Sequence, residues 1–213
     1  MTQTIEFAHP HRDAEYVSMF SRSVLKHAMM HCGVHRIIIT STYRSQTDQA
    51  RVMLQNLSPG GGSMYRGPGQ AVEAVGKKFA TERAVIQSGL TSGFDPAKPL
   101  RKYSQTQEEV ADLMVLKIHA QERHEGVGCV SQHQQDPRIL NVIDIDPAHV
   151  APKGHLLSFI RTLTHMPEIK RIGLPGGVKS FSDKHFRESV RCLHVEIPQP
   201  GEFDINGSVS STV

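Results

Sequence analysis

The stretch LNVIDIDP, residues 140–147, sets a carboxylate inside a short run of β-branched residues. Such a run favours an extended backbone and the Asp-Pro pair stops it, so we predict a strand over Leu140–Ile145. Side chains alternate between the two faces of a strand, which places Asp144 and Asp146 on the same face. The pattern indicates a polar site on one face of a sheet.

Two histidine fragments flank this strand. Ser131-Gln-His133 precedes it, and Cys192-Leu-His194-Val-Glu196-Ile197 follows within a second predicted strand, where Cys192, His194 and Glu196 share a face. Two imidazoles and one carboxylate are a sufficient protein ligand set for catalytic zinc, which keeps its fourth position open. Adjacent strands could bring the three side chains together, although a chain with 13 histidines also produces such groupings by chance.

The other elements follow from periodicity and capping signals. We predict a first helix over Asp13–Cys32, capped by Asp13 and ended by Gly33. Further helices are predicted after the capping box Ser45–Asp48, over 70–88, from the capping box Thr106–Glu109 to near Gly126, and over His155–Thr164. The further predicted strands are Arg36–Tyr43, Val127–Ser131, Ile169–Leu174 and Val190–Ile197. Helices mostly precede strands and no βαβ alternation is present. The expected fold class is α+β, with a small, largely antiparallel sheet carrying the zinc site and helices flanking it.

Length and composition predict one domain over residues 1–213. A chain of 213 residues with 38% hydrophobic and 21% charged residues has the composition of a globular protein. Residues 58–69, SPGGGSMYRGPG, are rich in glycine and predict a mobile loop near the substrate, and residues 199–213 predict a loose C-terminal tail.

Charge and cysteine usage narrow the function classes. The net charge of +3 comes without an aromatic platform, a basic helix or finger spacing, so no nucleic-acid partner is expected. The cysteines Cys32, Cys129 and Cys192 are odd in number and widely spaced, so the sequence indicates neither a disulfide framework nor a thiolate zinc site. No apolar run approaches the length of a membrane span and no signal peptide is visible, so we expect synthesis in the cytoplasm.

Four fragments in order resemble one family of enzymes. TSTYRSQTDQ (residues 40–49), SQH (131–133), NVIDIDP (141–147) and LHVE (193–196) resemble the zinc D-Ala-D-Ala carboxypeptidases and L-alanyl-D-glutamate endopeptidases, which share a metal fold with hedgehog signalling domains. The resemblance covers roughly residues 14–198 and implies Zn²⁺ as cofactor, with His133, Asp144 and His194 as ligands. It also implies that Arg44 holds a substrate carboxylate or carbonyl and that Ser131 lies beside the substrate; a structural turn is the alternative role of each.

The chain departs from the family pattern in two places. The spacing from His133 to Asp144 is longer than usual, which makes Asp146 a rival ligand. The family's general base, an acid three residues before the last histidine or a histidine two before it, is replaced by Arg191 and Cys192. Hydrolysis needs a group that takes a proton from the attacking water, so Glu196 and Glu188 become the candidate catalytic residues.

The resemblance implies a hydrolase of the bacterial cell wall. We expect a zinc metallopeptidase that cuts a stem-peptide bond of peptidoglycan, as carboxypeptidase or endopeptidase, delivered as a phage endolysin or with a virion. Its expected partners are the stem peptide and other virion proteins. The alternative is a non-catalytic phage tail or baseplate protein that retains the metallopeptidase fold, which Arg191 at the expected base position favours.

Overall fold

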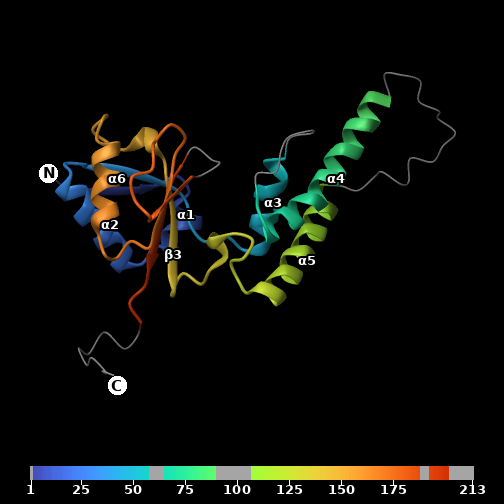
Figure 1. Cartoon of the computed structure of the whole chain (residues 1–213), viewed down its shortest axis with the longest axis horizontal. Helices are drawn as coiled ribbons and strands as arrows, with labels where there is room; N and C mark the ends of the chain where they lie inside the picture. The colour runs from blue at the N-terminus through green and yellow to red at the C-terminus, as the bar shows by residue number, and fades with distance from the viewer. Residues whose placement is uncertain (1, 58–64, 90–106, 188–191, 202–213) are drawn as a thin grey trace. The chain divides into compact units, whose positions relative to one another are not determined.

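The computed structural model describes residues 2–57, 65–89, 107–187 and 192–201 (Figure 1). The contacts divide the chain into two compact units: one joins Met1–Tyr43 with Gln135–Val213, and the other is Arg44–Gln134. A single domain over residues 1–213 therefore stays a prediction.

A six-stranded sheet organises the first unit. Its strands are β1 (Thr4–Phe7), β2 (Arg36–Ser41), β3 (Leu140–Ile145), β4 (Arg171–Leu174), β5 (His185–Arg187) and β6 (Leu193–Pro198), in the order β1-β2-β3-β6-β4-β5. The three central pairings are antiparallel, whereas β1 with β2 and β4 with β5 are parallel. The predicted α+β class is confirmed; the sheet is antiparallel at its centre and mixed as a whole.

One face of this sheet carries the main apolar core. The helical segments of the unit are α1 (Pro10–Asp13), η1 (Ala14–Tyr16), α2 (Met19–His31), η4 (Pro147–His149) and α6 (Leu156–His165), and α2 packs beside α6 (Figure 1). Alternate strand residues such as Ile143, Ile145 and Val195 join Leu25 of α2 and Phe159 of α6 in this core. The residues between them, Asp144 and His194 among them, therefore project from the opposite face.

The first long helix begins later than predicted. Ser18 caps α2 by accepting a hydrogen bond from the Ser21 backbone N–H, whereas Asp13 belongs to α1 and is fully buried. Both residue types are good caps, and Asp13 is used for a tertiary contact instead. The predicted end is confirmed, because Gly33 follows α2 with a φ of 73° that favours glycine.

Three helices form the second unit: α3 (Gln46–Gln55), α4 (Pro68–Gly89) and α5 (Gln107–Glu125). Ser45 caps α3, as predicted, by accepting from the Asp48 backbone N–H. Met53, Val72, Met114 and Ile118 lie in a separate buried cluster that holds the three helices together. This unit therefore has a core of its own.

Several sequence predictions need correction. Residues 127–131 form no strand, because Gly126 and Gly128 take positive φ values of 91° and 85° and turn the chain. The end of the predicted loop 58–69 belongs to α4, because a proline such as Pro68 fits the first position of a helix. Residues 58–64 lie outside the described residues. Gln199 is not loose, since its side chain donates to Ser21 Oγ, and residues 202–213 lie outside the description.

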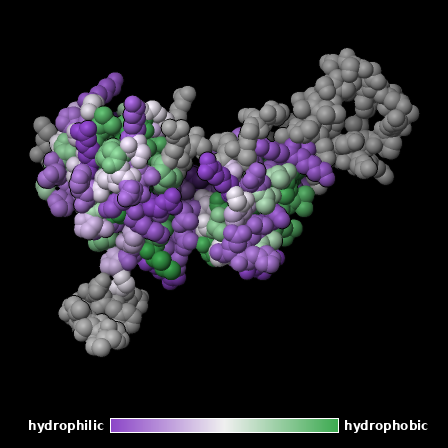
Figure 2. All heavy atoms as spheres, in the orientation of Figure 1, coloured by the Kyte–Doolittle hydropathy of each residue, from purple (hydrophilic) through white to green (hydrophobic). Residues whose placement is uncertain are grey.

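On the face seen in Figure 2, the surface of each unit mixes hydrophilic and hydrophobic residues. Over the residues that the structure describes, no helix is both long and apolar enough to cross a membrane. None of the three cysteines forms a disulfide.

Candidate metal centre

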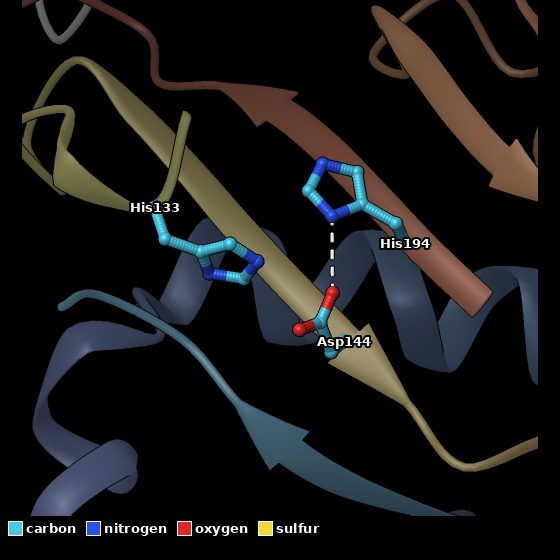
Figure 3. A group of neighbouring side chains, drawn as sticks. All are labelled: His133, Asp144 and His194. Carbon is cyan, nitrogen blue, oxygen red and sulfur yellow. Dashed lines mark hydrogen bonds and ion pairs between the residues drawn. The ribbon is translucent and has the colours of Figure 1, made fainter. Parts of the chain in front are cut away.

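Three buried side chains converge on the face of the sheet opposite the apolar core. His133 lies in the short 3-10 helix η3 (Gln132–Gln134), Asp144 in β3 and His194 in β6. Their possible ligand atoms all lie within 4.8 Å of one another, and the residues are 6%, 6% and 5% exposed. Figure 3 shows the two imidazoles and the carboxylate turned toward one another. The structure thus brings together the three ligands that the sequence predicts.

Strand register explains why Asp144 and His194 meet. The two residues are direct partners in the antiparallel pairing of β3 with β6. Opposite residues of an antiparallel pair have their Cβ atoms about 4.5–5.5 Å apart on the same face. The buried neighbours Ile143 and Val195 hold the strands on the core and direct the polar pair to the other face.

The His194 imidazole contacts a different carboxylate at each ring nitrogen. Its Nδ1 lies 3.0 Å from Asp144 Oδ1, and its Nε2 lies 3.5 Å from Glu196 Oε1. The ring also packs edge-on against Phe186 of β5, with centroids 5.4 Å apart. These contacts determine the orientation of the ring.

Glu196 is a charged group with almost no access to solvent. It is 1% exposed, and its Oε1 lies 3.8 Å from Arg171 Nη1 on the neighbouring strand β4. Burial raises the pKa of Glu196, but the hydrogen bond and charge of His194 and the charges of Arg171 and Lys170 outweigh it, so the pKa is lowered overall. The Glu196 carboxylate lies on the Nε2 side of His194.

A β-bulge lies directly opposite Asp144. Ile39 pairs with Ile145 and Ser41 with Asp144, so Thr40 is an extra residue of β2, and its hydroxyl donates to the Asp144 carbonyl at 3.3 Å. Bulges bend a strand and often redirect side chains beside functional sites. This one supports the backbone of a candidate ligand.

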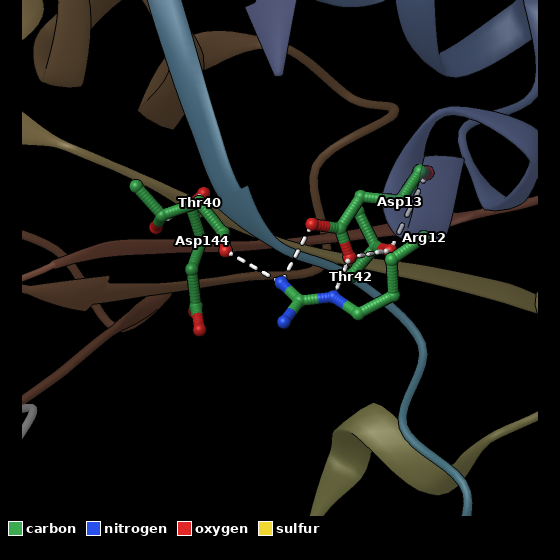
Figure 4. A network of polar contacts seen from close by, with 5 residues as sticks. All are labelled: Arg12, Asp13, Thr40, Thr42 and Asp144. Atoms are coloured by element: carbon green, nitrogen blue, oxygen red, sulfur yellow. Dashed lines mark hydrogen bonds and ion pairs between the residues drawn. The ribbon is translucent and has the colours of Figure 1, made fainter. Parts of the chain in front are cut away.

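A polar network around Arg12 and Asp13 contacts the bulge at Thr40 (Figure 4). The Arg12 guanidinium donates to both carboxylate oxygens of Asp13 and to the Thr40 carbonyl, at 2.9, 2.6 and 2.9 Å. Thr42 Oγ1 donates to Asp13 Oδ1 at 3.0 Å. Asp13 is thereby connected through Arg12 and Thr40 to the backbone of Asp144.

The two predicted substrate-binding residues, Arg44 and Ser131, both lie next to η3. The Arg44 backbone N–H donates to the His133 carbonyl at 2.8 Å, and its Nη1 donates to Gln49 Oε1 at 3.4 Å. Ser131 is partly exposed and its carbonyl accepts from the Gln134 N–H. Arg44 is thus directly attached to a candidate ligand residue, while its substrate role stays a prediction.

The structure tests the rival ligand, Asp146, but not the second candidate base, Glu188. Asp146 caps η4 by accepting from the Ala148 N–H and contacts His149 Nδ1 at 2.6 Å, and it does not join the group of ligand atoms. Glu188 and Arg191 lie outside the described residues.

The donor set suits a zinc ion. Two imidazoles and a carboxylate leave one position of a tetrahedron open, and the possible ligand atoms lie within 4.8 Å of one another. In the described ranges of the chain this is the one group of three or more His, Cys, Asp or Glu residues with such spacing. The site can hold a metal ion; the donors alone do not select zinc from other divalent metals.

Arg171 and Phe186 were not predicted as parts of this site. Arg171 faces Glu196 across the pairing of β4 with β6, and Phe186 reaches His194 from β5. Neither residue has a motif in the sequence, because each enters the site only through strand pairing.

Comparison of the chain with protein-family models, curated proteins and solved structures finds no match in any of the three.

Proposed function

We propose that the chain is a zinc-dependent peptidase that hydrolyses a stem-peptide bond of peptidoglycan, as a phage endolysin or a virion-associated enzyme. One observation carries the proposal: His133, Asp144 and His194 lie within ligand distance of one another in a buried group. The order of the sequence fragments, with its resemblance to zinc carboxypeptidases and endopeptidases of the cell wall, supplies the substrate class.

The roles of the residues follow from their chemistry. His133, Asp144 and His194 would hold the ion, which supplies a Lewis acid for a peptide carbonyl and lowers the pKa of water. Arg44, attached to His133 through its backbone, presents a planar set of donors that suits a carboxylate or carbonyl of the stem peptide. The sequence offers two candidate proton acceptors, Glu188 and Glu196, of which Glu196 is almost fully buried.

The aspartates of β3 and η4 provide the decisive experiment. Asp144→Asn should abolish both stoichiometric zinc binding and the release of free amines from purified sacculi, because a neutral amide is a poor zinc ligand. Asp146→Asn, two residues away, should keep both properties since Asp146 caps η4 and lies outside the group. Chelator should inactivate the wild type and zinc should restore it. Loss in Asp146→Asn with retention in Asp144→Asn would exchange the two assignments.

A non-catalytic phage tail or baseplate protein with the same fold is the second candidate. The observation that favours it is the burial of Glu196, at 1% exposure, which keeps one of the two candidate general bases away from water. Wild-type protein that binds zinc but releases no amines from sacculi would replace the enzymatic proposal with this one.

A further inference from the structure

The two nitrogens of the His194 ring face two different carboxylates. Nδ1 points to Asp144 Oδ1 at 3.0 Å, inside the group of candidate ligand atoms. Nε2 points to the opposite side, where Glu196 Oε1 lies at 3.5 Å. A neutral imidazole carries one proton, so the partner of one nitrogen decides which nitrogen is free to bind a metal ion.

Glu196 is itself held in place by the next strand. Arg171 lies opposite Glu196 in the register of β4 with β6, and its Nη1 is 3.8 Å from Glu196 Oε1. The Arg171 guanidinium lies over the Phe186 ring at 4.4 Å, and Phe186 packs edge-on against His194. Arg171, Phe186, Glu196 and His194 thus form a closed set of contacts on one side of the centre.

We propose that Glu196 is a positioning residue that accepts the Nε2–H of His194 and leaves Nδ1 as the metal-binding atom. The proposal rests on the metal centre of the proposed function and concerns the chain's own residues around it. A carboxylate behind a ligating histidine fixes its tautomer and makes it a better ligand. Glu196 therefore acts through His194 and does not take a proton from the attacking water.

Position and burial separate this role from that of a general base. The Glu196 oxygens lie on the Nε2 side of the ring, away from the side where the three ligand atoms gather. Each oxygen has less than 1 Å² of accessible surface, so neither meets solvent. A general base has to come within hydrogen-bond reach of the water that it deprotonates.

Zinc affinity of matched variants tests the proposal without reference to turnover. Glu196→Gln keeps the shape and removes the charge, and it should weaken zinc binding roughly tenfold, while Glu196→Ala should weaken it by up to about a hundredfold. Glu168→Gln is the control, because Glu168 is a partly buried carboxylate of the first unit that lies outside the metal centre. Dissociation constants come from competition with a chromophoric chelator at neutral pH, and circular dichroism identifies folded variants.

The tautomer of His194 gives a second measurement that needs no variant to fold. Long-range ¹H–¹⁵N spectra of the zinc-loaded wild type should show His194 protonated at Nε2 and metal-bound at Nδ1. Protonation at Nδ1, or an unchanged zinc affinity in Glu196→Gln, overturns the positioning role. In the latter case, lost turnover would mark Glu196 as the general base. Wild type that binds no metal overturns the proposal and the metal centre together, whereas zinc binding without activity on sacculi overturns only the enzymatic function.

Discussion

Asp13 shows how a single buried charge can support a distant site. Its carboxylate is fully buried and accepts hydrogen bonds from Arg12 and Thr42, and Arg12 also binds the Thr40 carbonyl beside the bulge. A buried carboxylate is tolerated only when such donors compensate for lost hydration. The residue is therefore a structural anchor for the backbone near Asp144.

Asp13→Asn should destabilise the protein by about 1–3 kcal/mol, because the amide places a donor against the Arg12 guanidinium in a buried position. This loss of stability is smaller than for a fully buried ion pair, because half of the Arg12 side chain is exposed to solvent. Urea unfolding of the metal-free protein measures the effect. Asp136→Asn, which removes the exposed pair with Arg138, is the control and should cost clearly less. Equal losses in both variants would show that Asp13 has no special structural role.

At the scale of the element, the neutral imidazole of His185 connects β5 to α6 and to Phe181. His185 Nε2 lies 2.8 Å from Thr164 Oγ1 of α6, and Nδ1 accepts a hydrogen bond from the Phe181 N–H at 3.3 Å. Thr164 already donates to the Ile160 carbonyl, so the His185 Nε2–H is the donor to it. Both ring nitrogens are used by the neutral form, and protonation at Nδ1 would break the contact with Phe181.

The pH dependence of stability should reveal this histidine. Burial lowers the pKa of His185 below its usual value. The folded protein therefore binds a proton at His185 only at a lower pH, whereas the unfolded chain binds it below about pH 6.5. The stabilisation is complete above that pH and declines as pH falls to the lowered folded pKa. His185→Gln should flatten this decline in urea unfolding with chelator present. An unchanged slope between pH 7 and 5 would contradict the assignment.

Local signals predict some elements well and others not at all. β3 was predicted with its observed bounds, since its β-branched run is both local and buried, and Ser45 caps α3 as its capping box indicates. β1 and β5 were missed because strands of four and three residues depend on pairing with distant partners. The start of α2 was wrong because the sequence offers both Asp13 and Ser18 as caps, and only tertiary contacts choose between them.

The sequence likewise predicts some residues of the candidate site and not others. His133, Asp144 and His194 were predicted because the ordered fragments that contain them resemble zinc peptidases of the cell wall; periodicity alone places only residues of one strand, such as His194 and Glu196, on a common face. Periodicity could not separate Asp144 from Asp146, which share a face; the turn at η4, where Asp146 is a cap, separates them. Arg171 was unpredictable for another reason, since β4 and β6 are neighbours only in space.

For the whole molecule, metal binding and folding should be one equilibrium. A ligand that binds only the folded state stabilises it by about 2.7 kcal/mol when free ligand is a hundred times its dissociation constant. For a chain of 213 residues this corresponds to a rise of roughly 5–10 °C in melting temperature.

Thermal unfolding at a hundredfold zinc excess over the dissociation constant measures this rise. Asp146→Asn should show the wild-type shift and Asp144→Asn none. A shift of equal size in Asp144→Asn would place the bound zinc elsewhere on the protein.

Because Asp144 pairs directly with His194, metal binding at this group would depend on the alignment of the two strands. A slip of one residue between β3 and β6 would turn one strand's polar side chains toward the apolar core and remove a ligand from the centre. Chains with a misaligned sheet would therefore fail to take up zinc. Metal content would distinguish correctly assembled molecules from compact misfolded ones before any activity is measured.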